Sequence, residues 1–400
     1  MNSLEKLQML TDNQCKVVLT LLHRGDLSNA EIARTLDMKR TSLNNILYPM
    51  RDNGIIVEST LGESRGGRRP TLYGIRKEDY LLIGIDISIL YVKVVLTNIR
   101  MEMLYKEEFL MDETDTPEHT MDHIAEIIKK IKNRFDPDNS RLIGIGLGTA
   151  GPLNVKEDLL ADSHRFQAAG WECVHPREML EQRIHCPVVL ENGVNCAVLL
   201  EALYGSGRAY DNIGYFNCGI GIRVGTSSAG RLIRSLNDQE EAFSQMQMIQ
   251  YDGEKNKVHC IEEEITIAAM NMAYLRKIGR KADPEQAYSM QLFGELARAA
   301  ETENPVAGQV ISHAAQIMGI GISNFIRLMD SDLIIMAGPL IQSCPSYYEQ
   351  CVQTVRENLP MKQTVFVKMG QYGSDSIALG AAAVVVENLL RNRYDLYSRE

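Results

Sequence analysis

The sequence lacks the features that mark membrane, secreted and disulfide-stapled proteins. Its longest apolar run, residues 377–386, is about half of the roughly 20 residues that a membrane-spanning helix needs. The first ten residues include Glu5 and Lys6 and no apolar core, so we expect no secretory signal and a cytoplasmic location. No two of the eight cysteines form a CxxC pair, which argues against a zinc ribbon or a disulfide framework. With 400 residues, 45% hydrophobic and 24% charged, the chain is expected to be globular with two or three cores.

Charge is distributed unevenly along the chain. The net charge is −10, but residues 1–80 hold 12 Lys and Arg against 10 Asp and Glu, leaving 30 against 42 for the rest. From residue 38 to residue 76 there are seven basic side chains against three acidic ones. A small basic unit on an acidic body is typical of a protein with one face that approaches a polyanion, although a charge cluster is more often just a solvated face.

The first eighty residues have the pattern of a winged helix-turn-helix. Asp12 or Asn13 is expected to cap a first helix, which Gly25 ends. Ser28, with a glutamate three residues later, has the spacing of a capping box and predicts a second, short helix. A third helix is expected from about residue 39 or 40, with a kink at Pro49.

In this motif the third helix enters the DNA major groove while the second braces it on the backbone. Arg40 and Asn44 or Asn45 are chemically able to read guanine and adenine edges, whereas Lys39 and Thr41 suit phosphates better. Together with the neighbouring hydroxyl of the helix, the predicted DNA-binding residues of this segment are Lys39, Arg40, Thr41, Ser42, Asn44 and Asn45.

Two β-rich runs, residues 55–59 and 71–75, bracket a glycine-containing basic loop and predict a wing. Arg65, Arg68 and Arg69 crowd the loop and could enter an adjacent minor groove. Taken alone, the loop could equally be a solvated basic linker. Next to three helices of this pattern it favours DNA binding, and we predict a DNA-binding domain over residues 1–79.

The body, residues 80–400, has two rounds of the same pattern. Strand-like runs from Tyr80 onward precede a helix over residues 117–135, and α/β units follow. A second glycine-rich hairpin begins near residue 212 and leads into long helices and two further strands. The repetition predicts a duplicated α/β body with a cleft between two lobes, at about 80–190 and 191–400.

At this point several segments together resemble the transcription-factor branch of the ROK family. The segments are LSNAEIARTLDMKRTSLNNIL, SRGGRRPTLYGI, GIGLGTAGPLN, PVVLENGVNCAVLLEALYG, LMDSDLIIMAGPL and SIALGAAAVV, in the family's order. The resemblance covers nearly the whole chain. It implies an actin-like, hexokinase-type fold for the body, a homodimer or larger homo-oligomer, and DNA contacts that are switched by a sugar or a protein partner.

The departures from the family's kinases argue against catalysis. The resemblance aligns the kinases' Glu-Asn-Asp triplet with Glu191, Asn192 and Gly193, and glycine cannot act as the general base. The kinases' first phosphate loop, Asp-x-Gly-x-Thr, corresponds to Asp86-Ile-Ser-Ile-Leu90, where bulky side chains occupy the positions of close backbone approach. We therefore expect no enzyme activity and no cofactor.

Ligand-binding features are few. The family's zinc motif is absent, and His119 and His123 have no third ligand nearby in sequence, so no metal site is expected. By resemblance, Asn192 matches a sugar-contacting amide, with Gly151 and Glu191 beside it, although Asn192 could instead bond backbone groups at a strand end.

The resulting hypothesis is a repressor of carbohydrate-related genes. A dimer or tetramer would hold two DNA-binding domains on an inverted repeat in double-stranded DNA, and an effector in the cleft would misalign them. Two alternatives stay open at this point. The chain could be a sugar kinase of the same family, or a constitutive DNA-binding or scaffold protein without a small-molecule effector.

Overall fold

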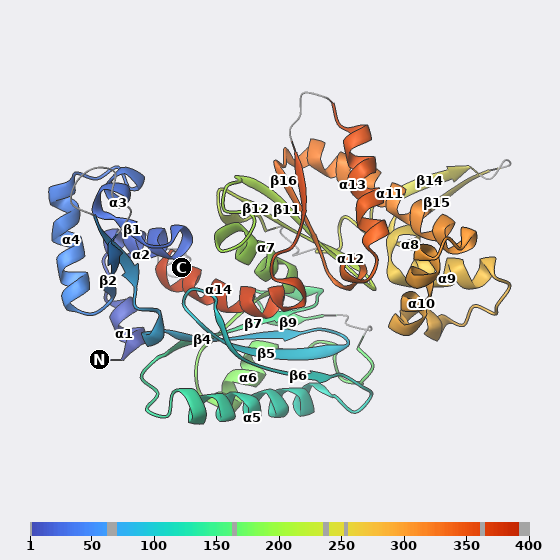
Figure 1. Cartoon of the computed structure of the whole chain (residues 1–400). Helices are drawn as coiled ribbons and strands as arrows, with labels where there is room; N and C mark the ends of the chain where they lie inside the picture. The colour runs from blue at the N-terminus through green and yellow to red at the C-terminus, as the bar shows by residue number, and fades with distance from the viewer. Residues whose placement is uncertain are drawn as a thin grey trace. The chain divides into compact units, whose positions relative to one another are not determined.

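A computed structural model of the chain describes residues 2–61, 70–161, 166–234, 240–251, 255–360 and 365–391. Two compact units are present (Figure 1). One comprises residues 1–196 and 377–400, and the other comprises residues 197–376. The predicted lobe boundary assigned the whole of 191–400 to one lobe. That assignment is corrected at both ends, since the division falls after Cys196 and the last helix belongs to the first unit.

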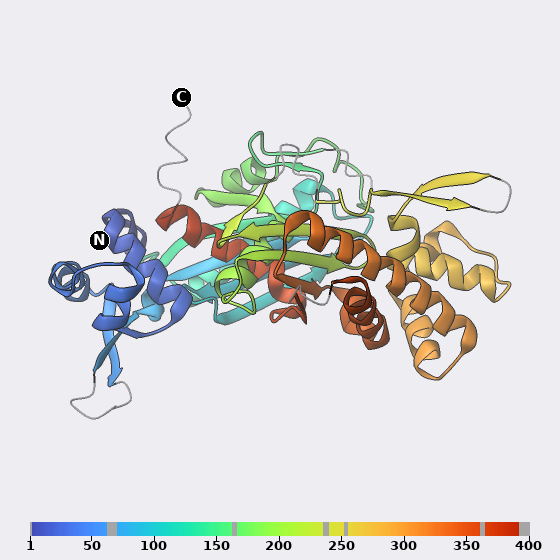
Figure 2. The same ribbon diagram turned by 90° about the horizontal axis from the view of Figure 1, so that it is seen from above.

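The N-terminal domain of the first unit combines four helices with a small sheet. Its elements are α1 (Ser3–Gln8), α2 (Asp12–Arg24), β1 (Leu27–Ser28), α3 (Asn29–Thr35), α4 (Arg40–Asp52), β2 (Ile56–Leu61) and β3 (Thr71–Ile75), followed by the 3-10 turn η1 (Lys77–Asp79). The strands are ordered β1-β3-β2 and are antiparallel. The domain has the helix and hairpin order of a winged helix-turn-helix, with α1 and β1 as additions to the predicted pattern (Figure 2).

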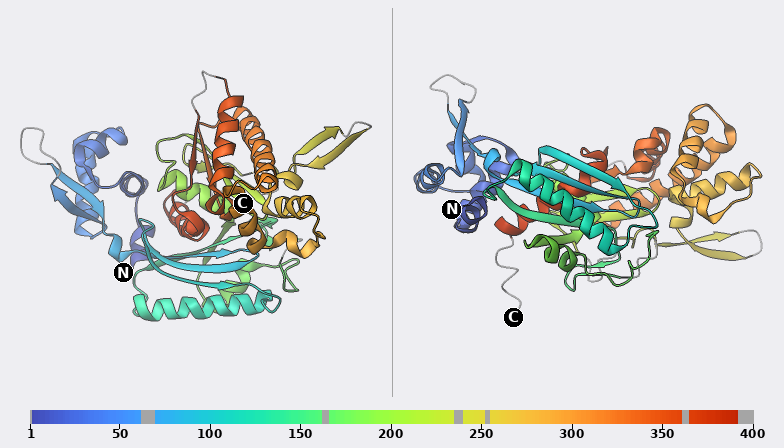
Figure 3. Two further views of the ribbon diagram at one scale, coloured as in Figure 1. Left: turned by 45° about the vertical axis from the view of Figure 1, so that its right-hand side comes forward. Right: turned by 90° about the horizontal axis from the view of Figure 1, so that it is seen from below.

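The rest of the first unit contains a five-stranded sheet with helices on both faces and a separate sheet of two short strands, β8 and β9. Its elements are β4 (Leu81–Ile87), β5 (Tyr91–Asn98), β6 (Met103–Leu110), α5 (Pro117–Phe135), β7 (Leu142–Thr149), β8 (Leu153–Asn154), β9 (Leu159–Leu160), α6 (Pro176–Ile184), β10 (Val188–Asn192) and α14 (Ser376–Leu390). Helix α5 lies along one face of the sheet, where its isoleucines pack into the core, and α14 lies on the opposite face (Figure 3).

Glycines on the sheet let α14 approach its backbone directly. A Cβ atom at Gly84 would lie 1.9 Å from the Ala378 carbonyl oxygen, and one at Gly146 would lie 2.0 Å from that of Ala381. Residues 373–390 are long and apolar enough to cross a membrane by composition alone, but 72% of this window is buried inside the protein. The apolar character of α14 is therefore explained by its packing on the sheet.

The second unit repeats the topology of the first. Its elements are α7 (Gly193–Leu203), which enters from the first unit, β11 (Asn212–Cys218), β12 (Ile222–Ser228), β13 (Arg231–Leu232), β14 (Gln247–Tyr251), β15 (Asn256–Cys260), α8 (Glu262–Ile265), α9 (Ile267–Lys277), η2 (Pro284–Tyr288), α10 (Met290–Glu301), α11 (Pro305–Met329), β16 (Leu333–Ala337), α12 (Pro339–Ser343), α13 (Pro345–Asn358), β17 (Phe366–Met369) and η3 (Gly373–Asp375). The sheet orders are β6-β5-β4-β7-β10 and β13-β12-β11-β16-β17. In each sheet, three consecutive strands (β4–β6 or β11–β13) form an antiparallel meander. Two parallel strands (β7 and β10, or β16 and β17) extend the sheet beyond the first strand of the meander, β4 or β11. The shared topology confirms the predicted duplicated α/β body.

Candidate functional site

Local sequence signals fix the helices of the N-terminal domain. Thr11 caps α2 in a reciprocal pair with Gln14, which corrects the predicted cap at Asp12 or Asn13. Gly25 ends the helix with a positive φ of 85°. Ser28 and Glu31 form the predicted capping box of α3, with Ser28 Oγ accepting the Glu31 amide at 3.3 Å. These caps fix the starts of α2 and α3, and α4 follows α3 after the short turn of residues 36–39, as in a helix-turn-helix.

Helix α4 buries one face and exposes the other. Leu43, Leu47 and Met50 are fully buried, and the helix continues through Pro49 to its end at Asp52. On the other side the structure exposes five of the predicted DNA-binding side chains, namely Lys39, Arg40, Thr41, Ser42 and Asn45. The face that the sequence assigned to DNA is thus open to a partner.

Asn44 differs from its neighbour Asn45. Its side chain is half-buried, and its Oδ1 accepts a hydrogen bond of 2.6 Å from Asn29 Nδ2 at the start of α3. The Asn45 side chain is exposed and makes no hydrogen bond within the residues that the structure describes. Of the two amides, Asn45 is therefore the one exposed on the helix surface, whereas Asn44 joins α3 to α4.

Tyr48 was missed at the sequence level although it extends the exposed face. Its side chain is 47% exposed, and the Arg51 guanidinium carbon lies 5.4 Å from the centre of its ring. Arg51 also pairs with Asp52 Oδ1 at 3.1 Å and Glu58 Oε1 at 3.3 Å, and hydrogen bonds to these carboxylates raise its pKa. The missed signal was position, since Tyr48 follows Asn45 by three residues and Thr41 by seven.

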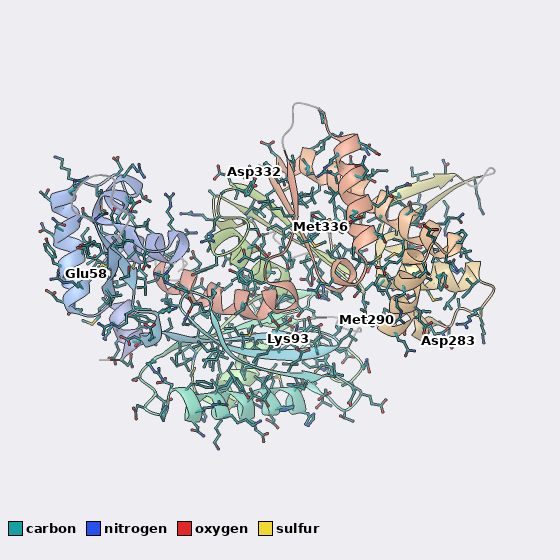
Figure 4. All side chains as sticks on the ribbon, viewed as in Figure 1. Glu58, Lys93, Asp283, Met290, Asp332 and Met336 are labelled. Carbon is teal, nitrogen blue, oxygen red and sulfur yellow. The ribbon has the colours of Figure 1, made fainter. Side chains whose placement is uncertain are left out.

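Strands β2 and β3 form the predicted wing. Ile56 pairs with Ile75 and Glu58 with Tyr73 across the hairpin. Figure 4 labels Glu58 on this domain, where it connects β2 to Arg51 of α4. The predicted wing residues Arg65, Arg68 and Arg69 lie outside the described residues.

The N-terminal domain is tied to the sheet of its own unit by polar contacts. The Ser3 amide donates to the Ser140 carbonyl at 2.8 Å, and Lys77 Nζ lies 2.7 Å from Glu102 Oε2. Asp26 pairs with Arg100. These contacts position α2, and with it the helix-turn-helix, on the body.

The C-terminal turn of α14 makes another such contact. His23 Nε2 of α2 lies 3.1 Å from Glu387 Oε1, and Arg391 Nε lies 3.1 Å from the other oxygen of this carboxylate. Both carboxylate oxygens of Glu387 are therefore in ion pairs, one with the N-terminal domain and one with Arg391, just beyond the end of α14.

The predicted ligand residues gather at the ends of β7 and β10. Glu191 and Asn192 are buried and end β10, and Gly151 is buried just beyond β7. Glu191 Oε1 accepts from the Asn192 amide and from Asn195 Nδ2, both at 3.0 Å. Asn192 Oδ1 accepts the Val194 amide at 3.0 Å, so the strand-end role is real. Its Nδ2 is buried and has no partner among the described residues.

The two positions that the resemblance aligns with catalytic elements of the kinases, Gly193 and the turn after Asp86, are tightly packed. At Gly193, a Cβ would lie 3.3 Å from both Ile377 Cγ2 and the Thr149 carbonyl oxygen, which is tighter than an ordinary contact. The turn after Asp86 is closed by a hydrogen bond from the Ser88 amide to the Tyr91 carbonyl, and Ile89 packs against the core. The segment after Asp86 is therefore a tight turn, and its partly buried isoleucine packs on the core of the first unit.

The two histidines of α5 each contact a neighbouring side chain. His119 Nδ1 lies 3.1 Å from Asp115 Oδ1, and the ring of His123 stacks on Phe109 with centroids 4.1 Å apart. Within the described ranges, no three His, Cys, Asp or Glu side chains are grouped so that they could hold a metal ion.

Comparisons with known proteins identify the class. Residues 82–388 match the model of the ROK family, and the chain belongs to this family. The xylose repressor of Caldicellulosiruptor bescii is 22% identical over 94% of this chain and 96% of its own length. A crystal structure of a ROK family transcriptional regulator, a homolog of the Escherichia coli MLC protein, aligns with a TM-score of 0.74 and 17% identity over 96% of this chain and 97% of its own.

A ROK hexokinase from Thermus thermophilus aligns with a TM-score of 0.62 and 20% identity, covering 97% of its own chain but 76% of this one. The two regulators therefore align with 94–96% of this chain, whereas the hexokinase aligns with 76% of it. The predicted family and fold class are confirmed, and the comparison favours the regulator branch over the kinases.

Proposed function

We propose that this chain is a DNA-binding transcriptional repressor of carbohydrate-related genes. The observation that carries the proposal is the exposed face of α4, which presents Lys39, Arg40, Thr41 and Asn45 on a helix-turn-helix. Arg and Asn are the side chains that read guanine and adenine edges, and Lys and Thr reach phosphates. The family and the full-length similarity to a repressor support the same function.

The mode of binding follows from this surface. Helix α4 lies in the major groove of an operator half-site, and Arg65, Arg68 and Arg69 of the wing contact the adjacent minor groove. A homo-oligomer, dimer or tetramer, places two such domains on an inverted repeat and gains effective concentration from the second. Such a protein acts on chromosomal DNA in the cytoplasm.

A small-molecule effector is proposed at Asn192. A buried donor without an acceptor costs roughly 1–3 kcal/mol, and a ligand oxygen that accepts from Asn192 Nδ2 recovers this free energy. A sugar hydroxyl beside Glu191 and Gly151 is such an acceptor. The ligand shifts the protein toward the conformation that it binds better, and DNA affinity changes with it.

Phosphotransfer is not part of the proposed function. Gly193 offers no carboxylate to take a proton from a sugar hydroxyl, and a general base is worth about 10² to 10⁴ in rate. The packed turn after Asp86 removes a second element of phosphate binding. The kinase-like body then serves oligomerisation and effector sensing.

The test of DNA binding is selection of duplexes from a random pool by the purified full chain. We expect an inverted repeat to be enriched. Arg40→Ala should weaken the selected site more than random DNA, whereas Arg68→Ala should weaken both and reduce the salt dependence by about one unit of slope. Equal losses for both variants on every sequence would contradict base reading by α4.

The test of the effector is thermal unfolding in the presence of a panel of sugars that includes xylose. A ligand specific for the folded protein raises the melting temperature, and Asn192→Ala should abolish the rise. A chain that binds its operator but responds to no sugar would be a constitutive regulator. Release of ADP from ATP with any hexose would instead support the kinase alternative.

A further inference from the structure

Tyr48 lies on the same exposed side of α4 as Thr41 and Asn45, but the proposed DNA contacts do not include it. Thr41, Asn44, Asn45 and Tyr48 follow the spacing i, i+3, i+4 and i+7, so they lie on one side of the helix, opposite the buried Leu43, Leu47 and Met50. The recognition helix of homeodomains uses this same spacing for the side chains that reach base edges. Asn44 is engaged by Asn29, which leaves Thr41, Asn45 and Tyr48 as the open members of the set.

The Tyr48 ring packs against a paired arginine. Arg51 lies over it with its guanidinium carbon 5.4 Å from the ring centre, and Arg51 is itself fixed by Asp52 and by Glu58 of β2. Two carboxylates offset the charge of Arg51, so this arginine is a poor phosphate contact and acts as a support for the ring. The exposed part of the ring therefore presents a positioned hydrocarbon surface toward the proposed DNA side.

We propose that Tyr48 reads a thymine by packing its ring against the C5-methyl group in the major groove. The inference rests on the proposed DNA-binding function. Among the groups that base pairs present in this groove, the thymine methyl is the apolar one, and apolar side chains recognise thymine through it. Seven residues of helix span roughly 10 Å, or about three base-pair steps, so Tyr48 and Thr41 contact different base pairs.

Deoxyuridine substitution tests this contact directly. Uracil lacks the C5-methyl group of thymine but keeps the same pairing edge. On the duplex selected by the full chain, each thymine is replaced in turn by deoxyuridine, and affinity is measured for the natural chain, Tyr48→Ala and Tyr48→Phe. Tyr288→Ala serves as the matched control, since Tyr288 is 57% exposed on the other unit.

The expected result is one thymine per half-site at which loss of the methyl weakens the natural chain about fourfold, the loss that exposure of one buried methyl predicts. At that position deoxyuridine should cost Tyr48→Ala nothing further, and Tyr48→Phe and Tyr288→Ala should behave as the natural chain does. Hydrogen exchange of α4 amides, unchanged in Tyr48→Ala, shows that the helix remains folded.

Other outcomes overturn the inference. If no thymine is coupled to Tyr48, the ring contacts no thymine methyl. If Tyr48→Phe and Tyr48→Ala weaken every duplex equally, the residue contacts phosphate through its hydroxyl. In both cases the chain still selects a duplex, so the proposed function stands while this inference fails. A natural chain that selects no duplex at all refutes the proposed function and this inference together.

Discussion

The adjacent amides Asn44 and Asn45 should have separable roles, one in the fold and one on DNA. Asn44→Ala removes the 2.6 Å hydrogen bond from Asn29 Nδ2, and an intramolecular hydrogen bond contributes about 0.5–1.5 kcal/mol. Opening of α3 should therefore become about 2- to 12-fold more frequent, which hydrogen exchange of its amides measures. Asn45→Ala removes an exposed side chain, so it should change stability by less than about 0.5 kcal/mol.

On DNA the order of the two variants should reverse. A bidentate asparagine to adenine contact discriminates by about 1–3 kcal/mol, so Asn45→Ala should lose about 5- to 150-fold on the selected site and little on a scrambled duplex. Competition binding with the two duplexes gives this ratio for each variant. If Asn44→Ala abolishes discrimination while the protection of α3 is unchanged, the assignment of the two amides is wrong.

Three further predictions concern packing, catalysis and pH. Gly84→Ala should lower the free energy of unfolding by about 1–3 kcal/mol or more, because its Cβ meets the Ala378 carbonyl. Gly294 lies in a helix with open space around it, so the control Gly294→Ala should be neutral or stabilising in the same thermal melt. Gly193→Asp should restore no measurable ADP release with any hexose, since the first phosphate turn stays closed; a robust rate would contradict this. Burial raises the pKa of Tyr80 to about 12. The stability that comes from the buried neutral phenol is therefore complete below about pH 10 and is lost as the pH rises toward about 12. Thermal melts over a pH series should show a smaller alkaline loss of stability for Tyr80→Phe than for the natural chain.

Local signals in the sequence predicted most of the N-terminal domain. The Ser28 capping box, the glycine that ends α2 and the bounds of β3 could be read directly, because capping and turn formation depend on a few neighbouring residues. The cap of α2 was placed one or two residues late, since Asp12 and Asn13 are as good cap formers as Thr11 and only the pairing with Gln14 decides. The engagement of Asn44 could not be predicted, because it depends on how α3 and α4 pack.

The division of the body was harder to predict than its fold class. Alternating strands and helices predicted a two-lobed α/β protein, but nothing local says that α14 returns to the first sheet. The sequence signal for its position lies in other elements, since α14 packs on Gly84 of β4 and on Gly144 and Gly146 of β7. Two glycines spaced by two residues on a strand share one face, which signals the close approach of another backbone but not its identity.

The contact between His23 and Glu387 joins residues 364 positions apart in the chain. During synthesis at about 5–20 residues per second, the ribosome adds the glutamate roughly 20 to 70 seconds after the histidine. A nascent chain can thus fold its helix-turn-helix early, yet the support for α2 is completed only when α14 has emerged. Fragments truncated before α14 would carry α4 and its exposed side chains but would lack the contact between His23 and Glu387 that supports α2.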